Sequence, residues 1–264
     1  MRRTTVLGTL VTTSLLTLSI ASPAAAAAGD VDYVALGDSY SSGVGAPGQS
    51  GLCLRSPNGY PGLWAAANDP ASYRSAACGG ATTDTLRATQ LIALSRKTDL
   101  VTVTIGGNDA GFAPTVISCT IVSDAACQAV VDDAAVTVRE DLPGKLDATY
   151  RGIKRHAPNA DVYVLGYPIL FDTTTATCGF AGMSIPKRRA INAANAELNT
   201  LIEDRATAAG FTYVDVTDEF AGHGICAAAN WIHSLVLVPP TDSFHPTAGG
   251  YRYGYLPALA SALT

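Results

Sequence analysis

The chain has 264 residues, of which 48% are hydrophobic and 15% charged, and this composition excludes disordered and fibrous proteins. Its formal net charge is −5 and its few lysines are scattered, so it lacks the clustered cations that a nucleic-acid-binding surface needs. A chain of this length can bury one sizeable core, and a single α/β enzyme domain often fills it.

The first 28 residues have the order of a secretory signal peptide. A basic Met1-Arg2-Arg3 precedes an apolar run from Val6 to Ile20, and residues 24–28 are all alanine. The apolar run is shorter than the roughly 20 residues of a membrane-spanning helix. We therefore predict a leader over residues 1–28 and a single domain over 29–264. The domain is expected to be secreted, not inserted in a membrane, and monomeric.

After the leader, runs rich in β-branched residues alternate with helical patterns. The predicted strands lie next to glycines and cover Val31–Leu36, Leu100–Ile105, Asp161–Leu165 and Phe211–Val216. Apolar spacing predicts a helix from Pro186 to Ala209, and residues 125–156 are helical in pattern with a break near Pro143-Gly144. This alternation predicts an α/β fold whose parallel sheet is covered on both faces.

In such a sheet the functional groups collect at the carboxyl ends of the strands. Gly37-Asp38-Ser39 follows the first strand. A serine at a strand-to-helix turn is a candidate nucleophile, although capping the helix is its commoner role. Asn108 follows the strand that starts at Leu100, where its amide can stabilise an oxyanion or cap the next helix.

Two further groups complete the set of candidate site residues. Gly80 can offer a backbone N–H at close approach, or simply form a turn. Near the C-terminus, His245 follows Asp242 by three residues, and a histidine near a carboxylate is a candidate general base with an orienting group. Nothing in these motifs requires a metal or another cofactor.

The six cysteines all follow the leader, at positions 53, 78, 119, 127, 178 and 226. Export favours disulfides over free thiols. Six cysteines allow 15 connectivities, and their spacing alone does not choose among them.

Four ordered blocks together resemble the SGNH, or GDSL, hydrolase family: Gly37-Asp38-Ser39, Gly80, Gly106-x-Asn108-Asp109 and Asp242-x-x-His245. The resemblance covers about residues 31–262 and implies a three-layer, flavodoxin-like fold that hydrolyses esters. The cysteine layout and residues 242–250 further resemble the secreted bacterial lipase and esterase branch. That branch implies the sequential disulfides Cys53–Cys78, Cys119–Cys127 and Cys178–Cys226.

The resemblance also implies a role for each matching residue. Ser39 is similar to the family nucleophile, and its own N–H, the Gly80 N–H and the Asn108 side chain correspond to the three oxyanion donors. His245 corresponds to the base, with a pKa expected near the ordinary value of about 6.5. Asp242 fits the acid position and is the favoured orienting group, although some members use a backbone carbonyl instead, which here belongs to Ser243.

The substrate is expected to be a lipid or other acyl ester, with phospholipids and acetylated sugars as alternatives. Phe112, Trp231 and Leu235 are candidates to line an acyl groove beside the site. The apolar run from Trp231 to Val238 fits a buried core segment equally well. The non-enzyme alternative is a secreted binding protein that keeps the fold but has lost catalysis.

Overall fold

The computed structural model describes residue 1 and residues 28–178 and 183–264 of the chain. Nearly all of the predicted signal peptide therefore lies outside the described residues. Within the described part, no helix is long and apolar enough to cross a membrane.

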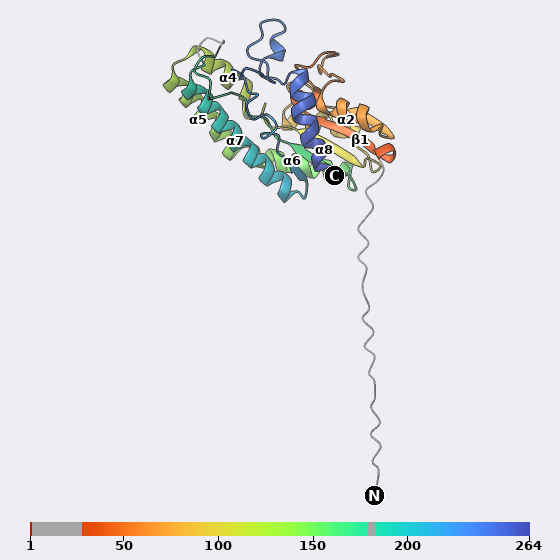
Figure 1. Ribbon diagram of the computed structural model, residues 1–264. Coiled ribbons are helices and arrows are strands. Elements are labelled where there is room, and N and C mark those ends of the chain that lie inside the picture. Colours follow the sequence, from red (N-terminus) through yellow and green to blue (C-terminus); the bar gives the residue numbers. More distant parts are fainter. Residues whose placement is uncertain (2–27, 179–182) are drawn as a thin grey trace.

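Five parallel strands form one central sheet in the order β2-β1-β3-β4-β5 (Figure 1). This is the strand order of flavodoxin-like sheets. The strands are β1 (Asp32–Gly37), β2 (Ser72–Ser75), β3 (Leu100–Thr104), β4 (Asp161–Leu165) and β5 (Thr212–Val214). The predicted α/β fold with a parallel sheet is confirmed.

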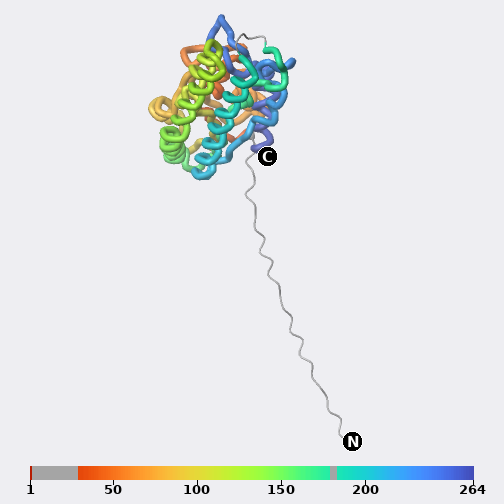
Figure 2. The backbone as a smooth tube through the Cα atoms, turned by 90° about the vertical axis from the view of Figure 1, so that its left-hand side faces the viewer, coloured from red at the N-terminus to blue at the C-terminus, as the bar shows by residue number. Residues whose placement is uncertain are grey.

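Helices cover both faces of the sheet and make it the middle of three layers. On one face α2 packs against α8, and on the other α3, α6 and α7 contact one another in turn. The long helices α5 and α7 run side by side in both views (Figures 1 and 2). The helices are α1 (Ser39–Ser42), α2 (Tyr60–Asn68), α3 (Thr83–Thr89), α4 (Phe112–Ile121), α5 (Asp124–Glu140), α6 (Leu142–His156), α7 (Ile185–Ala208) and α8 (Leu256–Ala262).

The predicted helix that starts at Pro186 is α7, which begins one residue earlier because Ser184 caps it by accepting from the Lys187 N–H. The predicted break in residues 125–156 falls at Asp141 rather than at Pro143. Pro143 lies in the first turn of α6, where a missing N–H costs no hydrogen bond, so it begins a helix instead of interrupting one.

The core lies between the sheet and its helices, and β1 and β3 contribute many of its residues. All five residues of β3 are buried, which is typical of a central parallel strand covered on both faces. From the helical layer, Ile191, Leu198 and Ile202 of α7 lie in the same core. The two central strands are thus rigidly held, and their carboxyl ends have fixed positions.

Gly37 at the end of β1 is a position that only glycine fits. Its φ is +124°, and a Cβ there would collide with the carbonyl oxygen of Thr104 on β3. The Gln90 side chain also holds the Gly37 backbone in place. Its amide donates to the Gly37 carbonyl and accepts from the Gly37 N–H, each at 2.8 Å. The chain turns from β1 into α1 at this point.

We expect Gly37→Ala to lower the free energy of unfolding by about 3 kcal/mol, because the added methyl group meets backbone and the φ is unfavourable. Gly222 is a matched control, since its φ is +78° but a Cβ there meets nothing within 4 Å. Gly222→Ala should cost only about 1 kcal/mol for the left-handed conformation. Denaturant unfolding measures both, and equal losses would contradict the proposed collision.

Candidate active site

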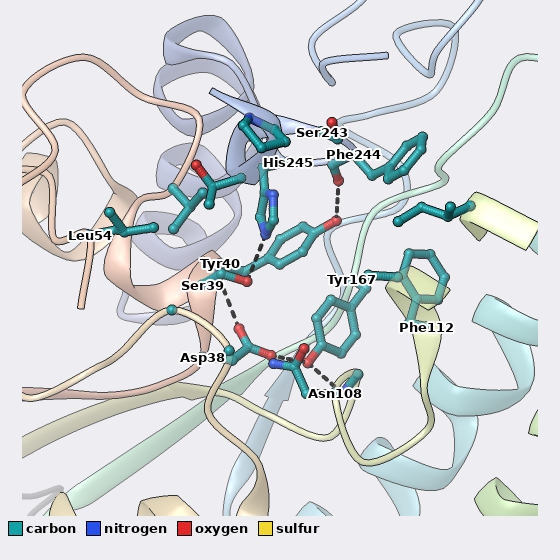
Figure 3. A pocket seen from close by; sticks show the side chains of 18 residues that line it. Asp38, Ser39, Tyr40, Leu54, Asn108, Phe112, Tyr167, Ser243, Phe244 and His245 are labelled. Carbon is teal, nitrogen blue, oxygen red and sulfur yellow. Dashed lines mark hydrogen bonds between the residues drawn. The ribbon is translucent and has the colours of Figure 1, made fainter. Parts of the chain in front are cut away.

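Ser39 is the first residue of α1 and lies at the carboxyl end of β1. Asp38 caps this short helix, because its carboxylate accepts a hydrogen bond from the Tyr40 N–H at 2.9 Å. Ser39 Oγ lies 2.7 Å from Nε2 of His245, which is 206 positions away in the sequence (Figure 3). The structure therefore brings together the predicted nucleophile and the predicted base.

Main-chain hydrogen bonds hold His245 in place from two sides. The Tyr40 hydroxyl, next to Ser39, donates to the carbonyl of Phe244 at 2.7 Å. His233 pairs with the same segment, since its N–H donates to the His245 carbonyl and its carbonyl accepts from the Phe244 N–H. Phe244 has a φ of +65°, an unusual conformation for a bulky residue, and these bonds hold it there.

The Asp242 carboxylate does not hydrogen-bond to the His245 ring, although the main-chain carbonyl of Asp242 accepts from the His245 N–H at 3.2 Å. Oδ1 of Asp242 accepts from the Gln49 side-chain amide at 2.9 Å. Among the described residues, Nδ1 of His245 has no hydrogen-bond partner of good geometry, but the backbone groups of Ser243 and Thr241 face the ring and raise its pKa. This geometry departs from the expectation that the Asp242 carboxylate orients the base, and it favours the backbone alternative at Ser243.

Burial is the dominant influence on the His245 ring. It lowers the pKa of His245 to about 4, outweighing the Ser243 backbone and the Asp242 charge, which both raise it. The expected value near 6.5 assumed an unperturbed ring. At neutral pH the ring is therefore uncharged and Nε2 is free to accept the Ser39 proton.

The three predicted oxyanion donors all line the cavity in front of Ser39. Neither the Ser39 N–H nor the Gly80 N–H donates to any oxygen of the residues that the structure describes. Asn108 uses one N–H of its side chain on the Ala81 carbonyl, at 2.9 Å, which leaves the other available. An oxygen atom bound in the cavity would thus meet unused donors.

Two links fix the donor loops relative to each other. The buried carboxylate of Asp109, next to Asn108, accepts from both the N–H and the hydroxyl of Thr83, at 2.8 and 2.7 Å. On the other side, the Gly79 N–H donates to the Cys53 carbonyl at 3.0 Å, beside the Cys53–Cys78 disulfide. Asp109 does not line the cavity; it holds the loop that carries Asn108 next to the segment that carries Gly80.

The six cysteines pair sequentially, as the resemblance implied: Cys53–Cys78, Cys119–Cys127 and Cys178–Cys226. In the part of the chain that the structure describes, no group of three or more His, Cys, Asp or Glu side chains is placed to hold a metal ion.

The cavity beside Ser39 has a volume of about 360 Å³ and a mostly apolar wall. Phe112 from α4 lies on one side of it and Leu54 on the opposite side (Figure 3). Ile117 from the same helix also lines the cavity. Phe112 is thus where the sequence placed it, in a candidate acyl groove.

The other two groove candidates, Trp231 and Leu235, are not among the residues that line this cavity. The Trp231 ring stacks on the His223 imidazole at 3.6 Å and meets Phe220 edge-on. Leu235 packs against the hydrophobic core. Both side chains pack within the protein and do not line a groove. The sequence analysis had left this alternative, a segment packed in the core, open.

Tyr167 is a site residue that the sequence analysis missed. Its hydroxyl donates to Asp38 at 2.5 Å and accepts from the Gly107 N–H at 2.9 Å, so it ties together the ends of β1, β3 and β4. Burial raises the pKa of Asp38 to about 7. The sequence could have indicated this residue, because Tyr167 follows β4 and therefore lies at the same carboxyl edge of the sheet as the other site residues.

A serine hydroxyl bonded to a neutral, buried imidazole, beside unused N–H donors and an apolar cavity, is the arrangement of a serine hydrolase. The chain matches the GDSL-like Lipase/Acylhydrolase family over residues 35–253. It belongs to this family and is an ester hydrolase.

Several named relatives come from Streptomyces. Lipase 1 of Streptomyces coelicolor is 47% identical over 253 residues, which cover 95% of this chain and 92% of that protein. The crystal structure of an extracellular lipase from Streptomyces rimosus has a TM-score of 0.84 at 46% identity, covering 88% of this chain and 99% of that one. Phospholipase A1 from Streptomyces albidoflavus has a TM-score of 0.85 at 47% identity, covering 89% and 100%.

The lowered pKa of His245 predicts an acid limb at unusually low pH. We expect kcat/KM for a soluble, uncharged ester to rise through about pH 4, because the ring accepts a proton only above its pKa. Circular dichroism at each pH is the control that the fold persists. A rise centred on the ordinary histidine value of about 6.5 would contradict the effect of burial.

Proposed function

We propose that this chain is a secreted, monomeric hydrolase that cleaves acyl esters of lipids through an acyl-enzyme on Ser39. The observation that carries the proposal is the 2.7 Å contact between Ser39 Oγ and His245 Nε2 at the wall of an apolar cavity. Three disulfides fit an oxidising compartment, and the similar lipase of Streptomyces rimosus is described as extracellular. The leader over residues 1–28 and the domain over 29–264 are part of this proposal.

The reaction follows from the placement of these groups. His245 Nε2 takes the proton of Ser39 Oγ as the oxygen attacks the ester carbonyl. The N–H groups of Ser39 and Gly80 and the Asn108 amide stabilise the oxyanion, and each such donor is worth about 10²–10³ in kcat. His245 returns the proton to the leaving alcohol, and water then attacks the acyl-enzyme by the same route.

The backbone carbonyl of Ser243 orients His245 in this mechanism. It faces the ring and favours its protonated form, whereas the Asp242 carboxylate is held by Gln49. A carbonyl dipole stabilises the transient imidazolium less than a carboxylate would. Burial therefore outweighs the carbonyl, and the resting ring is neutral with a pKa of about 4.

The cavity wall supports an acyl chain as the group that is bound. Phe112, Ile117 and Leu54 offer apolar surface next to the oxyanion donors. A phospholipid is the second candidate substrate, because this chain is similar to the phospholipase A1 of Streptomyces albidoflavus. Acetylated sugars fit this wall less well, since an acetyl group leaves most of it uncovered.

Ser39→Ala should abolish hydrolysis without loss of stability, because the side chain is small and lies at a helix start in the wall of the cavity. A fluorophosphonate should label the parent stoichiometrically at Ser39 and leave the variant unlabelled, as read by peptide mass spectrometry. A panel of p-nitrophenyl esters from acetyl to palmitoyl, with triglyceride, phosphatidylcholine and acetylated xylan, defines the substrate. An unlabelled parent, or a variant with normal turnover and a normal melting curve, would refute the mechanism.

Asp242→Asn should lower kcat by tenfold or less, since the carboxylate does not contact the base, whereas loss of the Asp in a serine protease triad costs about 10⁴. Because the Asp242 charge raises the pKa of His245, the acid limb should also move to lower pH. Gln49→Ala is the matched control: it removes the same hydrogen bond but keeps the charge, so it should leave the acid limb in place. A drop of several orders of magnitude for Asp242→Asn would return the orienting role to the carboxylate.

A further inference from the structure

The three segments that surround the cavity mouth carry no charge. Residues 39–54, 110–123 and 220–241 contain no Asp, Glu, Lys or Arg, although 15% of the whole chain is charged. Each segment supplies residues to the cavity wall or its edge: Leu54 from the first, Ile117 from the second and Pro240 from the third. The neutral stretches therefore meet at the entrance to Ser39.

Large aliphatic side chains stand in solvent on these segments, next to the residues that line the cavity. Leu52, Leu237 and Val238 are between 79% and 102% exposed, and Ile121, one helical turn beyond Ile117, is 83% exposed. We call these four residues the apolar rim. None of the four lines the cavity itself. Exposed aliphatic groups gathered at one entrance mark an interaction surface.

The segments that carry the rim lie at one end of the molecule. The stretch around residues 235–240 projects furthest at this end in both backbone views (Figures 1 and 2). Figure 1 shows the loop around residue 52 and helix α4 on either side of this stretch. In the close view, Leu54, Phe112 and Ser243 approach the cavity from three different sides (Figure 3). A flat partner resting on the rim would therefore cover the entrance to Ser39.

We propose that the apolar rim docks this hydrolase on the surface of an electrically neutral lipid layer, with the zwitterionic phosphatidylcholine bilayer as the partner that it fits. This inference rests on the proposed function, because lipid that touches the rim is adjacent to the cavity. The neutral segments offer no cation for anionic headgroups, so attraction comes from burial of aliphatic groups and not from charge. The rim also lacks the Trp, Tyr and Arg anchors typical of protein–protein hot spots.

Binding is measured by flotation with phosphatidylcholine vesicles in a Ser39→Ala background, which removes hydrolysis and so separates docking from catalysis. The rim variant Leu52→Ser with Leu237→Ser should bind at least about tenfold more weakly, since two aliphatic groups no longer leave water. The matched control is Ile92→Ser with Val136→Ser, two exposed aliphatic residues on η2 (Leu91–Ala93) and α5. It should bind like the parent.

With Ser39 intact, the rim variant should hydrolyse a soluble short-chain ester as the parent does, because neither substituted residue lines the cavity. If the parent did not hydrolyse that ester, the proposed function would be refuted. This measurement does not depend on vesicle binding. The docking proposal is overturned if the rim variant binds vesicles as tightly as the parent, or if the parent binds only anionic vesicles or none. It is also overturned if sedimentation shows a dimer that the rim substitutions dissociate, because a second copy would then cover this face.

Discussion

The hydrogen bond between Ser39 and His245 joins two distant parts of the chain, and backbone contacts around it keep both ends in place. Gly37 lets β1 approach β3 closely enough to start α1 where it does. The hydroxyl of Tyr40, next to Ser39, holds the carbonyl of Phe244, next to His245. In most of these contacts at least one partner is a main-chain group. The distance between Ser39 and His245 therefore depends little on long, flexible side chains.

Burial shifts the pKa values of two titratable groups beside Ser39, His245 and Asp38, in opposite directions. It lowers the pKa of His245 to about 4 and raises that of Asp38 to about 7, and each change favours the uncharged form. At neutral pH the resting His245 is therefore uncharged, and Asp38 is only partly ionised. Charge appears during the reaction, on the oxyanion and the imidazolium, in surroundings where fixed dipoles act strongly. In the proposed mechanism, the Ser39 and Gly80 N–H groups and the Asn108 amide meet the first charge, and the Ser243 carbonyl meets the second.

The sequence predicted strands that are apolar because they are buried. It missed an exposed strand whose side chains are mostly polar. Strands β1, β3 and β4 are apolar, but β2 reads Ser-Tyr-Arg-Ser and is mostly exposed at the sheet edge, so no pattern distinguishes it from a loop. Spacing placed Asp242 near His245 but does not say where a carboxylate points, and here it meets Gln49. Apolar composition likewise does not separate a groove from a core, and Trp231 belongs to the latter.

The neutral segments around the cavity mouth raise a problem of stability that the disulfides solve. The four rim side chains are in water and contribute no burial, and the segments have no charges with which to form ion pairs. Each segment nevertheless contains one bridged cysteine: Cys53, Cys119 and Cys226. A covalent tether restricts a loop without requiring its side chains to be buried or charged. The same bridges that fit an oxidising compartment thus allow the entrance to remain apolar and ordered, and a lipid-facing surface needs both properties.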